Sequence, residues 1–348
     1  NVVSIQGKII DNKDYRNIFV DKMGKNIKQV ASAAIDVNGN FSLSFEVDKT
    51  SFYKLKLDNK LNQLLVLNPG EIINISFNKN DFQNSMQVSG SPETELIVET
   101  QKIINGFKRR LDSLDMIFKK YVTPYNVDSL KYIINLQAQQ IEIERVNFLH
   151  NFIVKHNQSL AGLVFIEQLN MEQYLNTYSI LDKGLFEKYP YDDYVISFHN
   201  RVGAAQRTAI GMPAPEIKLP DPSGKIIPLS SLLGKIVIID FWASWCGPCR
   251  NENINKVAIY NKYKDKGVEF YSISLDRDKN AWLNGIKQDN LQWTQVSDLK
   301  YFQSEAAILY GVTSIPSMFI MDRKGYIVAK GLRGHQLEEK IIELLSKP

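Results

Sequence analysis

The sequence predicts a multidomain α+β protein in which an all-β region and a helical region precede an α/β domain. Three observations support this prediction. Apolar residues alternate with polar ones over residues 1–92, recur every three to four residues over 93–210, and form alternating strand-like and helix-like segments over 211–348. A chain of 348 residues with 44% apolar and 23% charged content can also hold two or three domains.

Residues 1–92 are predicted to form a β-sandwich. Turn sequences such as Asn38-Gly39 and Asn68-Pro69-Gly70 separate short alternating apolar runs. The expected strands include residues 2–5, 41–45, 53–57, 64–67 and 72–77. Because the region has no cluster of His, Asp, Glu or Cys residues, we expect it to act as a spacer, a docking surface or a dimerisation face.

Residues 93–210 are predicted to be helical. A first long helix begins after Ser91-Pro92 and ends before Thr123-Pro124, and a second carries apolar residues from 130 to 153. Shorter helices are expected near residues 159–169, 180–188 and 191–207. Their apolar stripes fit a protein core better than a cofactor groove.

Residues 211–348 form the last predicted domain, which begins at the breaker-rich segment Gly211-Met212-Pro213-Ala214-Pro215. We first expect a hairpin turning at 221–224, a buried strand beginning at Ile236 and a helix containing Cys249. A strand at 268–275, helices near 279–288 and 302–310, strands at 318–321 and 326–329, and a helix at 335–346 follow. This alternation indicates an α/β sheet ending in an antiparallel hairpin.

The chemistry is expected where the buried strand ends and Cys246-Gly247-Pro248-Cys249 begins a helix. Cysteines three residues apart on a first helical turn share one face and lie close enough to form and release a disulfide. The positive end of the helix dipole favours the thiolate of Cys246, which predicts that Cys246 is the nucleophile. Cys249 lies one turn deeper and is expected to be the resolving thiol.

The bulk properties limit the partners and cofactors. These two cysteines are the only ones in the chain, so electrons must come from or go to another molecule, and we expect no cofactor or metal beyond the cysteine pair. A net charge of +4, with Lys-Arg runs inside helical patterns, argues against nucleic-acid binding. No apolar run reaches the length of a membrane span, and the first residue, Asn1, suggests that a leader was removed.

Trp245-Cys246-Gly247-Pro248-Cys249, together with Ser314-Ile315-Pro316 before a later strand, resembles the thioredoxin superfamily. The opening segment 211–215 and the length between the cysteine helix and Pro316 are most similar to the TlpA/ResA group of extracytoplasmic thiol-disulfide oxidoreductases. The layout of the whole chain is similar to Bacteroidetes envelope proteins with an N-terminal domain of unknown function. The resemblance implies a C-terminal thioredoxin-like α/β domain, and for residues 1–210 it is architectural only.

The resemblance also implies residues around the substrate. Pro316 is expected to be cis and to lie beside the cysteines, where the free backbone of Ile315 could pair with an extended client strand. The side chain and backbone contacts to the substrate are expected to come from Trp245, Gly247 and Pro248.

Two carboxylates are candidate proton acceptors. Asp240 matches a buried carboxylate of thioredoxins, which could take the proton from Cys249, although a hydrogen-bonded aspartate at a strand end also fits the pattern. Glu252, one helical turn after Cys249, matches a glutamate of the ResA group and is a candidate second acid or base. An exposed helix glutamate fits that position nearly as well.

The sequence departs from thioredoxin at two positions. Ile254 replaces a helix proline, so the cysteine helix is expected to lack that kink. Ser272 stands where thioredoxins carry a lysine near the buried carboxylate, so Asp240 is expected to lack a positive neighbour.

The leading functional hypothesis is a thiol-disulfide oxidoreductase, of the protein-disulfide reductase type, that reduces client proteins and serves cell redox homeostasis. The implied location is the periplasm or the outer envelope, with a lipid anchor as an option and a membrane thiol carrier as electron donor. A homodimer through the N-terminal domain is the candidate assembly. The client, the donor and the direction of electron flow stay open.

Three other functions are alternatives. The chain could be mainly a binding or assembly module in which residues 1–207 recognise a partner and the redox site is accessory. A peroxiredoxin-like peroxidase needs a threonine where Ala243 stands. A zinc site would combine the cysteines with His150 and His156, which lie about a hundred residues upstream on a helix.

Overall fold

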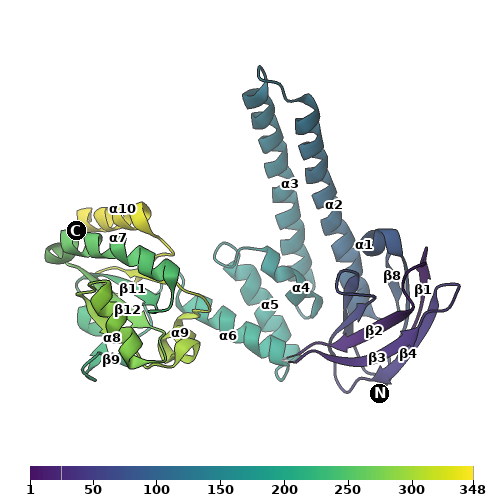
Figure 1. Cartoon of the computed structure of the whole chain (residues 1–348), viewed down its shortest axis with the longest axis horizontal. Coiled ribbons are helices and arrows are strands. Elements are labelled where there is room, and N and C mark those ends of the chain that lie inside the picture. Colours follow the sequence, from purple (N-terminus) through teal and green to yellow (C-terminus); the bar gives the residue numbers. More distant parts are fainter. Residues whose placement is uncertain (25, 348) are drawn as a thin grey trace. The chain divides into compact units, whose positions relative to one another are not determined.

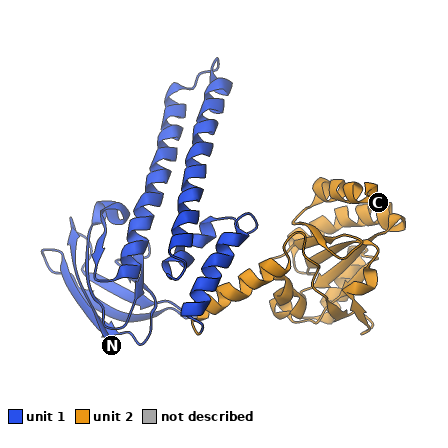
Figure 2. Cartoon of the chain, turned by 180° about the vertical axis from the view of Figure 1, so that it is seen from behind, with its two compact units in different colours: residues 1–190 blue, residues 191–348 orange. Residues whose placement is uncertain are grey.

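The computed structural model describes residues 1–24 and 26–347. The chain divides into two compact units, Asn1–Pro190 and Tyr191–Pro348 (Figure 2). Helix α6 (Asp193–Arg207), which the sequence pattern groups with the preceding helices, belongs to the second unit, where it packs against α9 (Glu305–Tyr310). Among the described residues, no helix is both long enough and apolar enough to cross a membrane.

The first unit begins with two four-stranded sheets, ordered β4-β1-β7-β8 and β3-β2-β5-β6 (Figure 1). The strands are β1 Val2–Ile10, β2 Asn17–Lys22, β3 Lys28–Ala34, β4 Asn40–Glu46, β5 Ser51–Lys56, β6 Asn62–Leu67, β7 Ile72–Asn78 and β8 Gln87–Ser89. Both sheets contribute to one apolar core, for example through Ile5 of β1 and Leu55 of β5. The predicted β-sandwich is confirmed.

Strands β2, β3 and β8 were not predicted. β3 consists largely of small and polar residues, and none of its residues is fully buried, so its sequence has little apolar alternation to detect. It nevertheless pairs with β2 along its length, because an edge strand is held mainly by its backbone hydrogen bonds.

Two long helices, α2 (Pro92–Tyr121) and α3 (Val127–Lys155), form an antiparallel hairpin that projects from the sheets (Figure 1). Proline in the first turn starts α2, and α2 ends shortly before Pro124, as the sequence predicts. The shorter helices of this unit are α1 Phe82–Ser85, α4 Ala161–Phe165 and α5 Leu175–Lys188. The helical middle segment is therefore confirmed.

The second unit is built around a five-stranded sheet ordered β13-β12-β11-β14-β15. Its strands are β11 Ile236–Trp242, β12 Val268–Ser274, β13 Thr294–Val296, β14 Ser317–Met321 and β15 Ile327–Lys330, and a separate hairpin joins β9 Lys218–Pro220 to β10 Ile226–Pro228. β11 pairs parallel with β12 and antiparallel with β14. Every residue of β11 is buried, as expected for a central strand covered on both faces.

Alternate residues of β11 face two different cores. The helices of this unit, besides α6 and α9, are α7 Gly247–Tyr263, α8 Lys279–Gln288 and α10 Gly334–Ser346. Ile238 and Trp242 pack with residues of α7, α8 and α10, whereas Ile239 and Phe241 pack with residues of α9 on the other face. Asp240 alternates with Ile239 and Phe241, so it faces the α7 side of the sheet.

Candidate active site

The two cysteines lie where β11 ends and α7 begins. Cys246 is the N-cap residue of α7, and its Sγ accepts a hydrogen bond from the backbone N–H of Cys249 at 3.2 Å. A disulfide joins the two sulfurs. Cys246 keeps 5% of its surface exposed, whereas Cys249 is fully buried. Another molecule can therefore reach Cys246 more easily than Cys249, which fits the roles of nucleophile and resolving thiol expected for them.

Pro316 directly precedes β14, the antiparallel neighbour of β11 in the sheet. The Ile315–Pro316 peptide bond is cis, and β14 begins at the next residue, Ser317, which pairs with Phe241 near the end of β11. Nη2 of Arg333 donates a hydrogen bond to the carbonyl oxygen of Pro316 at 2.9 Å. Among the described residues, the backbone N–H and C=O of Ile315 have no hydrogen-bond partner. These groups are free for another chain.

Asp240 forms a buried ion pair with Lys256 of α7. Nζ of Lys256 lies 2.7 Å from Oδ2 of Asp240, and the two side chains are 0% and 1% exposed. The expectation that Asp240 lacks a positive neighbour is therefore wrong. The lysine reaches the carboxylate from the covering helix, while Ser272 on the neighbouring strand donates its hydroxyl to the same oxygen at 3.0 Å.

The ion pair continues into a polar network along α7. Nζ of Lys256 also donates to Oδ1 of Asn253 at 3.0 Å, and Nδ2 of Asn253 donates to Oδ2 of Asp289 at 2.7 Å. Asp289 pairs with Arg250 and raises the pKa of its guanidinium, which stays charged. Nη1 of Arg250 donates to the carbonyl oxygen of Ser244 at 3.0 Å. Because Ser244 comes two residues before Cys246, the network connects the buried carboxylate to the turn that carries the nucleophile.

The other oxygen of Asp240 has no partner. Its Oδ1 is buried and forms no hydrogen bond with any described residue. Leaving a buried acceptor unsatisfied costs about 1–3 kcal/mol, and such groups in folded proteins often serve chemistry. Cys249 belongs to the core on the same side of the sheet. Asp240 thus has one oxygen fixed by Lys256 and Ser272 and one oxygen without a hydrogen bond to any described residue.

Glu252 is engaged with another helix. Its Oε1 accepts a hydrogen bond from the backbone N–H of Gly334, the first residue of α10, at 2.9 Å. Its Oε2 accepts a longer bond of 3.4 Å from Asn255. A carboxylate at a helix N-terminus satisfies an otherwise unpaired N–H and interacts favourably with the helix dipole. This contact was not predicted, because Gly334 lies 82 residues after Glu252 and nothing near Glu252 in the sequence indicates α10.

The expected substrate contacts lie at the surface. Trp245 is 51% exposed, and Gly247 and Pro248 are also exposed. The structure adds Tyr301 and Phe302, whose rings lie 5.3 and 6.5 Å from the Trp245 ring. Phe302 was expected in a helix, and neither aromatic residue was predicted to lie near the cysteines, since they follow Trp245 by more than fifty residues.

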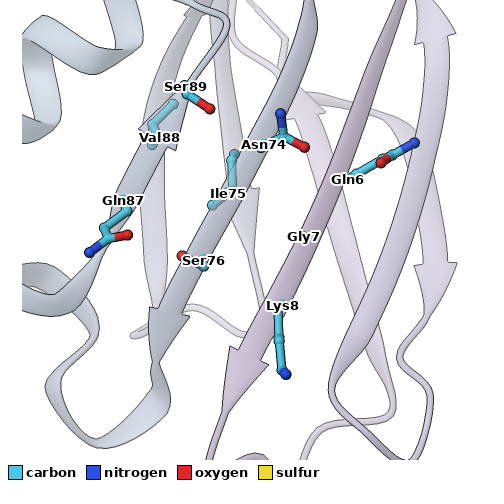
Figure 3. Close-up of a pocket in the computed structure, with 9 residues that line it drawn as sticks. All are labelled: Gln6, Gly7, Lys8, Asn74, Ile75, Ser76, Gln87, Val88 and Ser89. Carbon is cyan, nitrogen blue, oxygen red and sulfur yellow. The ribbon is translucent and has the colours of Figure 1, made fainter.

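A groove on the β-sandwich is a second candidate binding site (Figure 3). It crosses strands β1, β7 and β8, and its polar side chains are those of Gln6, Lys8, Asn74, Ser76, Gln87 and Ser89. None of these is a thiol, an imidazole or a carboxylate. The groove therefore offers a polar surface without a nucleophile or a general base.

The residues of the alternative zinc site are engaged elsewhere. Cys246 and Cys249 are bonded to each other, and His150 shares a hydrogen bond of 2.7 Å with Thr177. The ring of His156 packs against Phe152 at a centroid distance of 5.0 Å. Within the described parts of the chain, no group of three or more His, Cys, Asp or Glu side chains is arranged to hold a metal ion.

The chain is similar to known proteins in both units. Residues 210–330 match the AhpC/TSA family, and residues 3–97 match a domain of unknown function, DUF4369. The thiol-disulfide oxidoreductase ResA of Bacillus thuringiensis is 34% identical over 142 residues, which are 41% of this chain and 80% of that protein. ResA of Bacillus subtilis is 30% identical over 151 residues, 43% of this chain and 82% of that protein.

Solved structures with similar sequences also exist. One is the thioredoxin domain of a thiol-disulfide oxidoreductase from Bacteroides vulgatus, which is 34% identical, with a TM-score of 0.38. The match covers 40% of this chain and 99% of that domain.

Proposed function

Because this chain belongs to the ResA family of thiol-disulfide oxidoreductases, we propose that it reduces the disulfide bonds of client proteins outside the cytoplasm. The observation that carries the proposal is the geometry of the cysteine pair. Cys246 caps α7 and retains some exposure, Cys249 is fully buried, and the cis peptide before Pro316 leads into β14, which pairs with β11. One thiol can attack a client while the other waits to resolve the complex.

In the proposed reaction, the reduced pair passes two electrons to the client. The thiolate of Cys246 attacks one sulfur of the client disulfide, and the second client sulfur leaves as a thiolate and takes up a proton. Cys249 then loses its proton and attacks the Cys246 sulfur of the mixed disulfide. The first client sulfur leaves and is protonated, so the client ends as a dithiol and the enzyme as the Cys246–Cys249 disulfide.

We assign the removal of the Cys249 proton to Asp240. Support comes from the unpartnered Oδ1 atom and from the position of Asp240 on the same face of the sheet as the cysteine pair. Lys256 holds the opposite oxygen and fixes the orientation of the carboxylate. Glu252 remains the candidate second acid or base, although its bond to Gly334 favours a structural role.

The client is proposed to bind across the exposed end of the pair. The free backbone groups of Ile315 would pair with an extended client strand, and Trp245, Gly247 and Pro248 would contact the residues around the client cysteine. This places the client sulfur above Cys246.

The proposed setting is the periplasm or the outer envelope, with the protein held there by a lipid anchor. The oxidised pair must be recharged, and the chain has no third cysteine, so we propose a membrane thiol carrier as the electron donor. The homodimer expected through the N-terminal domain is proposed as the assembly, and we extend its interface to the α2–α3 hairpin of the same unit.

The first test is the equilibrium reduction potential of the cysteine pair, measured on the full chain against a dithiothreitol series. A value near that of thioredoxin, about −270 mV, supports the reductase. A value near that of a periplasmic oxidant, about −120 mV, would contradict it and assign electron flow in the opposite direction.

A trapping experiment separates the reductase from a binding module. The Cys249→Ser variant should accumulate mixed disulfides with clients, because the resolving thiol is missing. The Cys246→Ser, Cys249→Ser double variant should lose its clients. If the double variant retains the same partners, binding is the primary function and the redox site is accessory.

A peroxidase is the alternative raised by the match to the AhpC/TSA family. Ala243, three residues before Cys246, is buried and has no hydroxyl to orient a peroxide or the attacking thiolate. We expect no turnover of hydrogen peroxide with dithiothreitol as the reductant. Sustained, Cys246-dependent turnover would favour the peroxidase.

A further inference from the structure

Three aromatic rings and an arginine gather beside the disulfide. The Trp245 ring lies 5.3 Å from the Tyr301 ring, and the Tyr301 and Phe302 rings meet edge to face at 4.7 Å. The guanidinium carbon of Arg277 lies 4.5 Å from the centre of the Tyr301 ring. We term Trp245, Arg277, Tyr301 and Phe302 the aromatic platform. Its first member is the residue directly before Cys246.

Arg277 brings a positive charge that the protein does not neutralise. It is exposed, and no carboxylate among the described residues lies within ion-pair distance of it. The acidic residues on either side have other partners, because Asp276 accepts a bond from Ser244 at 2.6 Å and Asp278 caps α8. A guanidinium stacked on a ring keeps the N–H donors at its edge available. Arg277 can therefore bind a carboxylate from another molecule.

The loop that carries Tyr301 is held in an uncommon conformation. Leu299 and Tyr301 have φ values of 57° and 58°, which side-chain-bearing residues rarely adopt. Oγ of Ser297 accepts a hydrogen bond from the backbone N–H of Leu299 at 3.1 Å. Oδ2 of Asp298 accepts one from the backbone N–H of Glu305 at 3.0 Å. Because these bonds fix the loop before any partner arrives, binding loses less conformational entropy.

We propose that the aromatic platform binds the client segment next to the reactive cysteine and selects segments with Asp or Glu near that cysteine. The inference rests on the proposed reductase function. A client whose sulfur reaches Cys246 must bring its neighbouring residues close to Trp245. The Trp245 and Tyr301 rings are 5.3 Å apart, and Arg277 lies 4.5 Å beyond, over the Tyr301 ring. Together these two steps span roughly three residues of extended chain, so we expect the carboxylate at about that separation from the client cysteine. Apolar client side chains would pack on the rings and a carboxylate would pair with Arg277.

Two synthetic peptides test this selection. Each carries one cysteine in a mixed disulfide with 2-mercaptoethanol, and they differ only in having Asp or Lys three residues from the cysteine on both sides. The full chain, reduced beforehand and freed of reductant, should reduce the Asp peptide about two- to five-fold faster at low ionic strength, the size expected for one exposed ion pair. The preference should fade in high salt.

Three variants identify the residue responsible. Arg277→Glu should reverse the preference, and Tyr301→Leu should weaken it because the ring beneath the guanidinium is gone. Lys279→Glu is the matched control, since it makes the same charge change at an exposed residue two positions away and should leave the preference intact. Circular dichroism spectra of the two charge variants should match the parent, because both changes are at the surface, and the same measurement checks that Tyr301→Leu is folded.

Two results would overturn the inference. One is equal rates for both peptides with the unmodified chain. The other is an equal effect of Arg277→Glu and Lys279→Glu, which would mean that only net charge matters. Bis(2-hydroxyethyl) disulfide, which is small and neutral, separates this inference from the proposed function. If the small disulfide is reduced normally while the two peptides react at equal rates, only the role of the aromatic platform is disproved. If neither the small disulfide nor the peptides are reduced, the proposed reductase function is disproved as well.

Discussion

At the scale of single residues, Lys256 decides the environment of the buried carboxylate. Moving two opposite charges out of water is unfavourable, and a buried ion pair is tolerated when further hydrogen bonds satisfy its remaining donors and acceptors. Lys256 has a second acceptor in Asn253, and Asp240 has a second donor in Ser272, while Oδ1 of Asp240 has no partner among the described residues. Removing the lysine alone would leave a negative charge inside the core of the second unit.

We expect Lys256→Met to destabilise the second unit by about 3–5 kcal/mol, because an uncompensated buried charge remains. Tryptophan fluorescence during urea unfolding reports this unit alone. All four tryptophans of the chain belong to it, namely Trp242, Trp245, Trp282 and Trp293. The Asp240→Leu, Lys256→Met double variant should recover most of the loss. A single variant as stable as the parent would contradict the role given to the ion pair.

Glu252 allows a test between a cap and a proton-transfer group. Glu252→Ala should destabilise the second unit by about 0.5–2 kcal/mol through loss of the bond to Gly334, whereas Glu252→Gln keeps an acceptor and should lose less. If the role is structural, the rate and pH profile of client reduction by Glu252→Gln should match the parent. A rate loss in Glu252→Gln without a stability change would instead support an acid or base role.

At the scale of elements, the α2–α3 hairpin carries more apolar surface than two helices can bury. Ile134 and Ile141 of α3 are partly or fully buried, but its remaining large apolar residues include Ile133, Leu136 and Ile143, which are exposed. On α2, Ile103, Ile117 and Tyr121 are exposed as well. A helix with apolar residues on two sides is usually covered on both.

A second copy of the hairpin would suit this surface. Arg110 and Glu144, which join the two helices, neutralise each other at 2.6 Å, so equal faces would meet without strong repulsion. The stretch of α2 from Ile103 to Tyr121 is roughly 27 Å long, and two helices are roughly 20 Å wide. Such a face, about 500 Å² in projection, approaches the roughly 800 Å² per partner of a standard interface.

We therefore expect Leu136→Glu to convert the proposed homodimer into a monomer, as measured by size-exclusion chromatography with light scattering. Buried interface positions do not accept an unpaired charge. Ile342→Glu, at an exposed position of α10 in the second unit, is the matched control and should leave the mass unchanged. A parent chain that is monomeric at tens of micromolar would disprove the dimer.

At the scale of the whole molecule, the two units have separate cores and should unfold as separate transitions. Two tyrosines hold the segment that precedes β11 onto the sheet of the second unit. The hydroxyl of Tyr271 donates to the carbonyl oxygen of Ile227 at 2.7 Å, and that of Tyr310 donates to the carbonyl oxygen of Pro215 at 2.6 Å. Burial raises the pKa of both phenols, with a further contribution from Glu216.

This arrangement predicts that the second unit loses stability in alkali. A raised phenol pKa in the folded state means that folding favours the protonated phenol. The stability that the two phenols contribute is therefore complete below about pH 10, the usual phenol pKa in an unfolded chain, and is lost as the pH rises above it. Tryptophan fluorescence should show an alkaline transition that moves to higher pH in Tyr271→Phe, Tyr310→Phe. Tyr125→Phe, at a fully exposed tyrosine, should leave the transition unchanged. An unshifted transition in the double variant would contradict the assignment.

The sequence by itself determined the features that depend on neighbouring residues. A run of β-branched residues specified the central strand β11, and Gly-Pro between two cysteines specified a helix that starts with a thiol at its N-terminus. The resemblance to thioredoxins added the cis peptide before Pro316. These predictions succeed because periodicity, turn chemistry and helix capping act over a few residues.

Only the tertiary structure decided what each site residue contacts. Lys256 pairs with a carboxylate 16 residues earlier, and Glu252 caps a helix 82 residues later. Tyr301 reaches Trp245 across several intervening elements. No local pattern indicates these partners, because they depend on how strands and helices stack and on how far long side chains extend between them. The sequence therefore determined which groups carry the chemistry, and the packing of the second unit decided their charge partners and their neighbours at the surface.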